Sequence, residues 1–176
     1  IKALVGELKL VDDPAVRPLA SEREAKLKRL RDYVARNIRS AGPGLNQLPW
    51  SCFSSPETTL ASGYGNSADR AILLAAILKA AGIESRFVAV TPFGYAPATL
   101  KLLSRYPANW FSEVLVYVPA YETYLNDTSE YAKVGAARSE EQIGLNLSDG
   151  RLQVIRPRRK SESSVSLSYA IDLRAN

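Results

Sequence analysis

The chain has 176 residues, of which 46% are hydrophobic and 23% are charged. This length and composition predict one globular domain with a substantial core, and they exclude disorder throughout the chain. The net charge of +5 is mildly basic, but the basic residues are scattered, so we expect no nucleic-acid partner. No apolar run reaches the roughly 18 residues of a membrane span, so we expect no membrane span in this segment.

The N-terminal part of the chain predicts two helices. Apolar residues at helical spacing within residues 1–8 indicate a short helix. Ser21 and Glu24 then form a capping box ahead of an apolar stripe. We therefore expect an amphipathic helix from about 22 to 39, followed by a break at Gly42.

A segment rich in glycine, proline, serine and asparagine follows at residues 42–66. It predicts a long loop, and such loops often carry function. The aromatic residues Trp50 and Tyr64 either fix this loop to the core or face a ligand. The single cysteine, Cys52, is more typical of a buried small hydrophobe than of a nucleophile.

The next segment predicts a buried helix. Asn66 or Ser67 can cap its start, and Gly82 marks its end. Few polar residues follow Arg70 within it, and a helix that is apolar nearly all round belongs in the interior.

The remaining segments predict mainly strands. Strands are expected at 86–90, 114–118, 121–125, 152–155 and 165–171, with a short helix at 99–104. Helices followed by mostly antiparallel strands indicate an α+β fold in which the central buried helix packs on an antiparallel β-sheet.

The chain contains no histidine. Cys-His and Ser-His catalysis need an imidazole base, and zinc sites need histidines or several cysteines. We therefore expect no such catalysis, no metal site and no cofactor in this chain.

Three segments resemble the transglutaminase-like superfamily, which has the papain-like Cys-His-Asp fold, and in particular its bacterial branch. Gly63–Arg70 reads GYGNSADR and leads into the apolar helix, as the family's catalytic-cysteine motif does. Phe111–Pro119 resembles the family's Phe-Asn-His strand, and Leu125–Ala132 resembles its Leu-Asp-Pro-Thr segment. The matches are in the family's order and cover about residues 22–135.

The resemblance implies that the catalytic positions have changed. Ser67 stands where the family has cysteine, Glu113 where it has histidine and Asn126 where it has aspartate. Asparagine serves as third member in some papain-like enzymes, but a serine without a base is hardly nucleophilic, and a carboxylate is poorly matched to deprotonating an alcohol. The resemblance thus implies a degenerate triad and no catalytic residues.

The function implied is that of a catalytically inactive domain within a larger bacterial protein, located outside the cytoplasm, in the periplasm or at the cell surface. It would bind a peptide, a glycan or a neighbouring protein domain, or act as a scaffold. The candidate cleft residues are Trp50, Tyr64, Asp69 and Trp110. A pocket at Ser67 lined by Trp50, Tyr64 and Trp110 would favour binding, and a filled cleft would favour scaffolding.

The alternative function is a hydrolase with rearranged chemistry that uses Ser67, Glu113 and Asp69, since burial can raise one carboxyl pKa enough for acid–base work. Asp69 also lies in the first turn of the buried helix, where a carboxylate can hold the preceding loop. We expect residues 1–150 to form the transglutaminase-like domain. Residues 151–176 would add C-terminal strands that complete the sheet or lead into a following β-domain.

Overall fold

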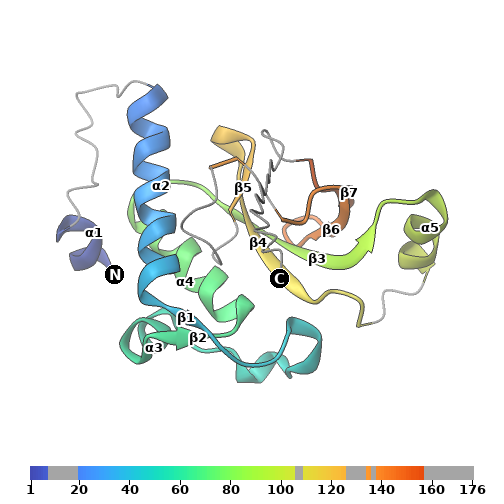
Figure 1. The fold of residues 1–176 in the computed structure, drawn as a ribbon, viewed down its shortest axis with the longest axis horizontal. Coiled ribbons are helices and arrows are strands. Elements are labelled where there is room, and N and C mark those ends of the chain that lie inside the picture. Colours follow the sequence, from blue (N-terminus) through green and yellow to red (C-terminus); the bar gives the residue numbers. More distant parts are fainter. Residues whose placement is uncertain (8–19, 106–108, 126–133, 136–137, 157–176) are drawn as a thin grey trace, which may run out of the picture.

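The computed structural model describes residues 1–7, 20–105, 109–125, 134–135 and 138–156, apart from the side chains of Ala20, Ser21 and Trp50. Helices and an antiparallel sheet are combined as the sequence predicts for an α+β fold (Figure 1). The helices of the described ranges are α1 (Lys2–Glu7), α2 (Ala20–Asn37), α3 (Pro56–Ser62), α4 (Ser67–Ala80) and α5 (Pro97–Arg105), with short 3₁₀ helices η1 (Leu45–Gln47), η2 (Trp50–Cys52) and η3 (Pro119–Tyr121).

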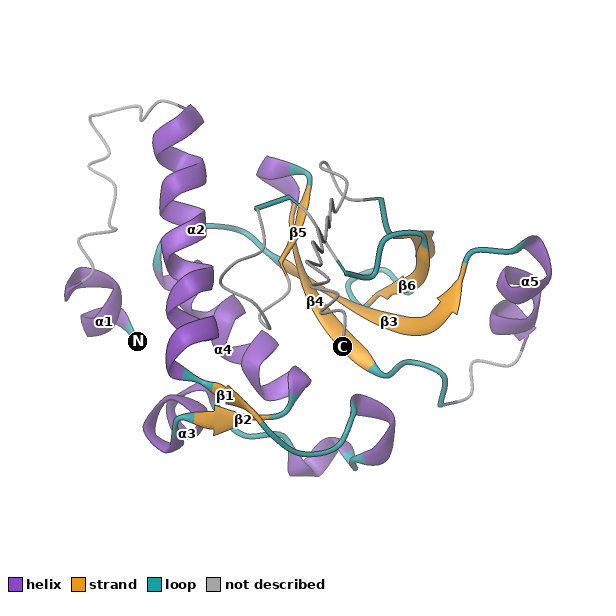
Figure 2. Cartoon of the chain, in the orientation of Figure 1, coloured by secondary structure: helices purple, strands orange, loops and turns teal. Residues whose placement is uncertain are grey.

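Five strands of the described ranges form the main sheet (Figure 2). They are β3 (Arg86–Gly94), β4 (Glu113–Val118), β5 (Thr123–Leu125), β6 (Gln142–Asn146) and β7 (Leu152–Val154). Their spatial order is β5-β4-β3-β6-β7, and every neighbouring pair is antiparallel. Two further short strands, β1 (Arg39–Ser40) and β2 (Tyr64–Gly65), pair in parallel beside the helices.

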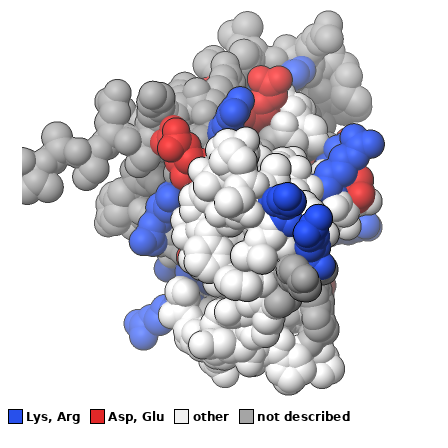
Figure 3. Space-filling view, turned by 90° about the vertical axis from the view of Figure 1, so that its right-hand side faces the viewer, with Lys and Arg blue, Asp and Glu red and all other residues white. Residues whose placement is uncertain are grey.

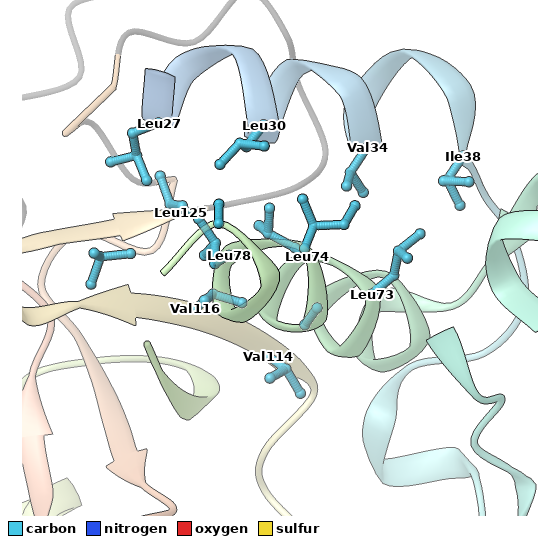
Figure 4. Packing of buried hydrophobic residues seen from close by; sticks show 14 of the residues in the cluster. Leu27, Leu30, Val34, Ile38, Leu73, Leu74, Leu78, Val114, Val116 and Leu125 are labelled. Atoms are coloured by element: carbon cyan, nitrogen blue, oxygen red, sulfur yellow. The ribbon is translucent and has the colours of Figure 1, made fainter. Parts of the chain in front are cut away.

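The main core lies between α2, α4 and one face of the sheet (Figure 4). Helix α4 packs on β4, and α2 packs on α4. The apolar stripe predicted for α2 is buried here, at Leu27, Leu30, Val34 and Ile38. Helix α4 is central because its apolar side chains point in several directions and contact both α2 and the sheet.

Alternate residues of β4 serve two different cores. Val114, Val116 and Val118 face α4, whereas Leu115 belongs to a second cluster on the opposite face of the sheet. Tyr117 packs against that second cluster. This is the two-residue alternation of a strand buried on both faces.

The prediction of a loop throughout 42–66 is wrong in part, because this segment contains η1, η2, β2 and the helix α3. Ser55 caps α3 by accepting a hydrogen bond from Thr58 N at 3.2 Å, and Pro56 occupies its first position. Gly63, at φ 71°, ends it in the left-handed region that glycine favours.

Two other predictions differ from the structure. Helix α2 begins at Ala20, so Ser21 lies within the helix instead of capping it. Strand β6 was not predicted, since Gly144 at its centre weakens the strand pattern. The structure needs a glycine there, because a Cβ at this position would lie 2.6 Å from Val88 Cγ1. The strand predicted at 165–171 lies outside the described residues.

Candidate functional site

The start of α4 is organised by two side chains that cap each other. Asn66 is the N-cap, and its Oδ1 accepts hydrogen bonds from Ala68 N at 2.8 Å and Asp69 N at 3.0 Å. In return, Asp69 Oδ2 accepts from Asn66 N at 3.3 Å and from Asn66 Nδ2 at 2.8 Å. Ser67 is therefore held as the first residue of the central buried helix, which confirms the predicted placement.

Asp69 also ties the preceding loop to the helix. Its second oxygen, Oδ1, accepts a hydrogen bond from Ser54 N at 2.7 Å, and the residue is only 5% exposed. Gly65 packs against it so closely that a Cβ there would lie 2.9 Å from Asp69 Cβ. Both carboxylate oxygens of Asp69 are thus engaged in holding local structure.

Ser67 connects the helix start with the start of β4. Its half-buried hydroxyl accepts a hydrogen bond from Val114 N at 3.3 Å, although the two residues are 47 positions apart in sequence. The fold therefore brings Ser67 next to the strand that carries Glu113, as the ordered motifs predict.

The Glu113 side chain belongs to the other side of this strand. It is exposed, and it lines a small depression together with Val90 and Arg138. Val90 is its cross-strand neighbour and part of the second core, whereas the next residue, Val114, faces α4. No hydrogen bond joins Ser67 and Glu113 among the described residues.

The third predicted position, Asn126, lies outside the described residues. The residue before it, Leu125, is paired with Val116 on β4. The predicted convergence of the three side chains therefore stays a prediction.

The predicted aromatic residues are dispersed. Tyr64 is 60% exposed on β2. Trp110 packs against Phe93, with ring centroids 5.2 Å apart and planes inclined at 60°. The backbone of Trp50 lies in η2, and its side chain is not described. Cys52, expected to be buried, is exposed, because η2 is a turn at the surface.

An apolar pocket of about 200 Å³ lies beside the first turn of α4. Its lining residues all have apolar side chains and come from several separated segments: Leu45, Phe53, Ala68, Ile72, Phe87, Val114 and Leu147. Tyr64 and Trp110 are not among them. Sequence reasoning missed this pocket, because lining residues such as Leu45 and Leu147 are far apart in the sequence.

Metal-ligating residues form no centre within the described ranges. On the face that carries α5, lysine and arginine lie mainly around the margin of a broad uncharged area (Figure 3). In that part of the chain, no three His, Cys, Asp or Glu side chains are grouped as a metal site requires. None of the described helices combines the length and apolar character needed to cross a membrane.

Comparisons with known proteins bear on the fold and on the family. A search of curated proteins finds no match. Among solved structures, a candidate protease from Parabacteroides distasonis aligns with a TM-score of 0.52 and 22% identity, over 88% of this chain and 27% of that one. Calcium-bound LapG from Legionella pneumophila aligns with a TM-score of 0.52 and 15% identity, over 90% of this chain and 78% of that one.

At these identities the two structures show a shared fold alone, and this chain spans only about a quarter of the Parabacteroides protein. The family model is more specific. The model of the transglutaminase-like superfamily matches residues 14–134, which is more than half of the chain and includes the start of α4, β4 and β5. The chain belongs to the transglutaminase-like superfamily.

Proposed function

We propose that this chain is a catalytically inactive transglutaminase-like domain that binds a peptide segment of another protein. One observation carries the proposal: among the described residues, the residue at the nucleophile position, Ser67, hydrogen-bonds to the backbone N–H of Val114 and to no side-chain base, in a chain without histidine. A serine hydroxyl needs a neighbouring base to become a nucleophile at neutral pH. The positive N-terminal end of α4 cannot replace a base, since it stabilises a negative charge by only about 0.3–2 kcal/mol.

The carboxylates near Ser67 are poorly placed to replace the base. Asp69 accepts three N–H donors with its two oxygens, so proton transfer from Ser67 would break the cap of α4. Glu113 lines a depression with residues of the opposite sheet face. These contacts weigh against the alternative hydrolase that would use Ser67, Glu113 and Asp69.

The apolar pocket beside α4 differs from the expected pocket, because Ser67, Tyr64 and Trp110 do not line it, but an open apolar pocket at this helix supports binding over scaffolding. Its lining side chains are all apolar. A glycan would leave hydroxyl groups without partners in such a pocket, whereas an apolar side chain of a peptide would be stabilised by leaving water. The similar Parabacteroides structure is designated a candidate protease, and proteases bind peptides. We therefore infer that peptide binding is kept and cleavage is lost, in a domain of a larger bacterial protein outside the cytoplasm.

Two residues on the surface make a matched test of the pocket. Leu147 lines the pocket and is 42% exposed, whereas Leu102 lies on α5, away from it, and is 44% exposed. Peptides selected from a library on the purified protein should be rich in large apolar residues. Leu147→Asp should weaken the binding of a selected peptide about tenfold, because the peptide loses an apolar contact in the pocket. Leu102→Asp should leave the binding unchanged.

The same preparation tests inactivity. A fluorogenic peptide library should show no turnover above background. Turnover that Ser67→Ala abolishes would overturn the inactive assignment. Absence of any selected peptide, or equal weakening by Leu147→Asp and Leu102→Asp, would replace peptide binding by a scaffolding role.

A further inference from the structure

A second hollow lies on the other side of β4 from the apolar pocket. It has a volume of about 140 Å³ and is formed by the end of β3, the start of β4 and the turn that leads into β6. Val90, Ser139 and Gln142 are among the residues that line it. Glu113 and Arg138 bring a negative and a positive charge to the same hollow.

Within the described part of the chain, both charges are free to meet a ligand. The side chains of Glu113 and Arg138 are exposed, and neither forms an ion pair with the other or with another residue in the described part of the chain. Opposite charges that line one hollow without pairing are complementary to a molecule that carries both charges itself. A simple anion would be attracted by Arg138 but repelled by Glu113, and a simple cation would meet the reverse.

Backbone pairing anchors Glu113 and the turn that follows Arg138. Glu113 is paired with Val90 in the β3–β4 register, next to a hydrogen bond from Ser112 N to Val90 O at 3.0 Å. The turn after Arg138 is closed by a hydrogen bond from Gln142 N to Ser139 O at 3.1 Å. Such anchoring lowers the ordering cost of binding at these two points, because the ligand does not have to fix them.

The size of the hollow limits the ligand. Pockets for drug-sized ligands usually measure about 300–1,000 Å³, so a hollow of about 140 Å³ accommodates a single small unit. We propose that the hollow between Glu113 and Arg138 binds a zwitterion of the size of one small amino acid. Arg138 would donate hydrogen bonds to its carboxylate, and Glu113 would accept them from its ammonium group.

This proposal does not depend on the inactivity of Ser67, and it is tested by NMR titration of the isotope-labelled protein. Glycine and alanine serve as zwitterionic probes, and acetate and methylammonium serve as single-charge probes at equal ionic strength. We expect saturable shifts at the amides of Glu113 and Arg138 with glycine or alanine, and binding of acetate and methylammonium at least about tenfold weaker.

Variants assign the binding to the two charges. Glu113→Gln and Arg138→Gln should each weaken glycine binding about tenfold, whereas the control Arg151→Gln, at an exposed arginine outside the hollow, should not. The double exchange Glu113→Arg with Arg138→Glu should restore binding. It swaps the positions of the two charges without removing either, so the zwitterion can bind in the opposite orientation. Equal binding of all four probes, no saturable shifts, or insensitivity to both single substitutions would overturn the proposal.

Discussion

The loop-to-helix connection at Asp69 allows a quantitative test of how the site is held together. In Asp69→Ala, the backbone N–H of Ser54 loses its acceptor, and Asn66 loses the acceptor for its own N–H and for Nδ2. A hydrogen bond to a charged group contributes about 1.5–3 kcal/mol, and the loss of half a capping box costs about 1 kcal/mol. The free energy of unfolding should therefore fall by about 2.5–4 kcal/mol.

The assay is urea unfolding followed by circular dichroism, with hydrogen exchange at the Ser54 amide as a local readout. Asp149→Ala is the matched control, because Asp149 is exposed and its Oδ1 accepts one backbone hydrogen bond, from Arg151 N at 3.0 Å. The control should cost less than about 1 kcal/mol. If both variants lose the same stability, or if exchange at Ser54 is unchanged in Asp69→Ala, the assigned role of Asp69 is wrong.

Two further predictions concern the second core. Gly144→Ala should lower the free energy of unfolding by about 1–3 kcal/mol, because the new Cβ would overlap Val88. In Gly94→Ala, the control, no atom lies within 4 Å of the new Cβ, so this packing cost should be absent. Thermal unfolding of the two variants makes the comparison. Burial, and secondarily the charge of Tyr117, raises the pKa of Tyr124 above its ordinary value of 10.0. Folding thus favours the neutral form of Tyr124. The stability that the folded protein gains from neutral Tyr124 is complete below pH 10 and declines as the pH rises above 10. Urea unfolding between pH 8 and 11 should show a shallower decline for Tyr124→Phe, and an identical decline would contradict the assignment.

Long apolar patterns made much of the fold predictable from the sequence. The stripe of α2 and the nearly uniform apolar character of α4 could be read directly, and so could the strand at 114–118. Helix α3 was missed although its signals are present, with Ser55 and Pro56 at its start, because seven mostly polar residues have no strong periodicity. Short elements of this kind are decided by caps and tertiary contacts.

The site was predictable at the level of the backbone only. The motif placed Ser67 at the helix start, and the structure shows it hydrogen-bonded to the backbone at the start of β4, while the convergence of the three side chains stays a prediction. Which sheet face Glu113 joins could not be derived from the sequence, because a shift of one residue in the phase of a strand reverses all its side chains. The apolar pocket was also beyond reach, since residues as far apart as Leu45 and Leu147 meet only after folding.

The central claim is that Ser67 is not activated as a nucleophile, and a serine-reactive fluorophosphonate tests it without knowledge of any substrate. The native protein is incubated with the reagent near neutral pH, and the adduct is located by mass spectrometry. We predict that Ser67 reacts no faster than Ser62, an exposed serine at the last position of α3. Stoichiometric labelling of Ser67 that is lost on unfolding, or in Glu113→Gln, would contradict the account and establish a working serine hydrolase.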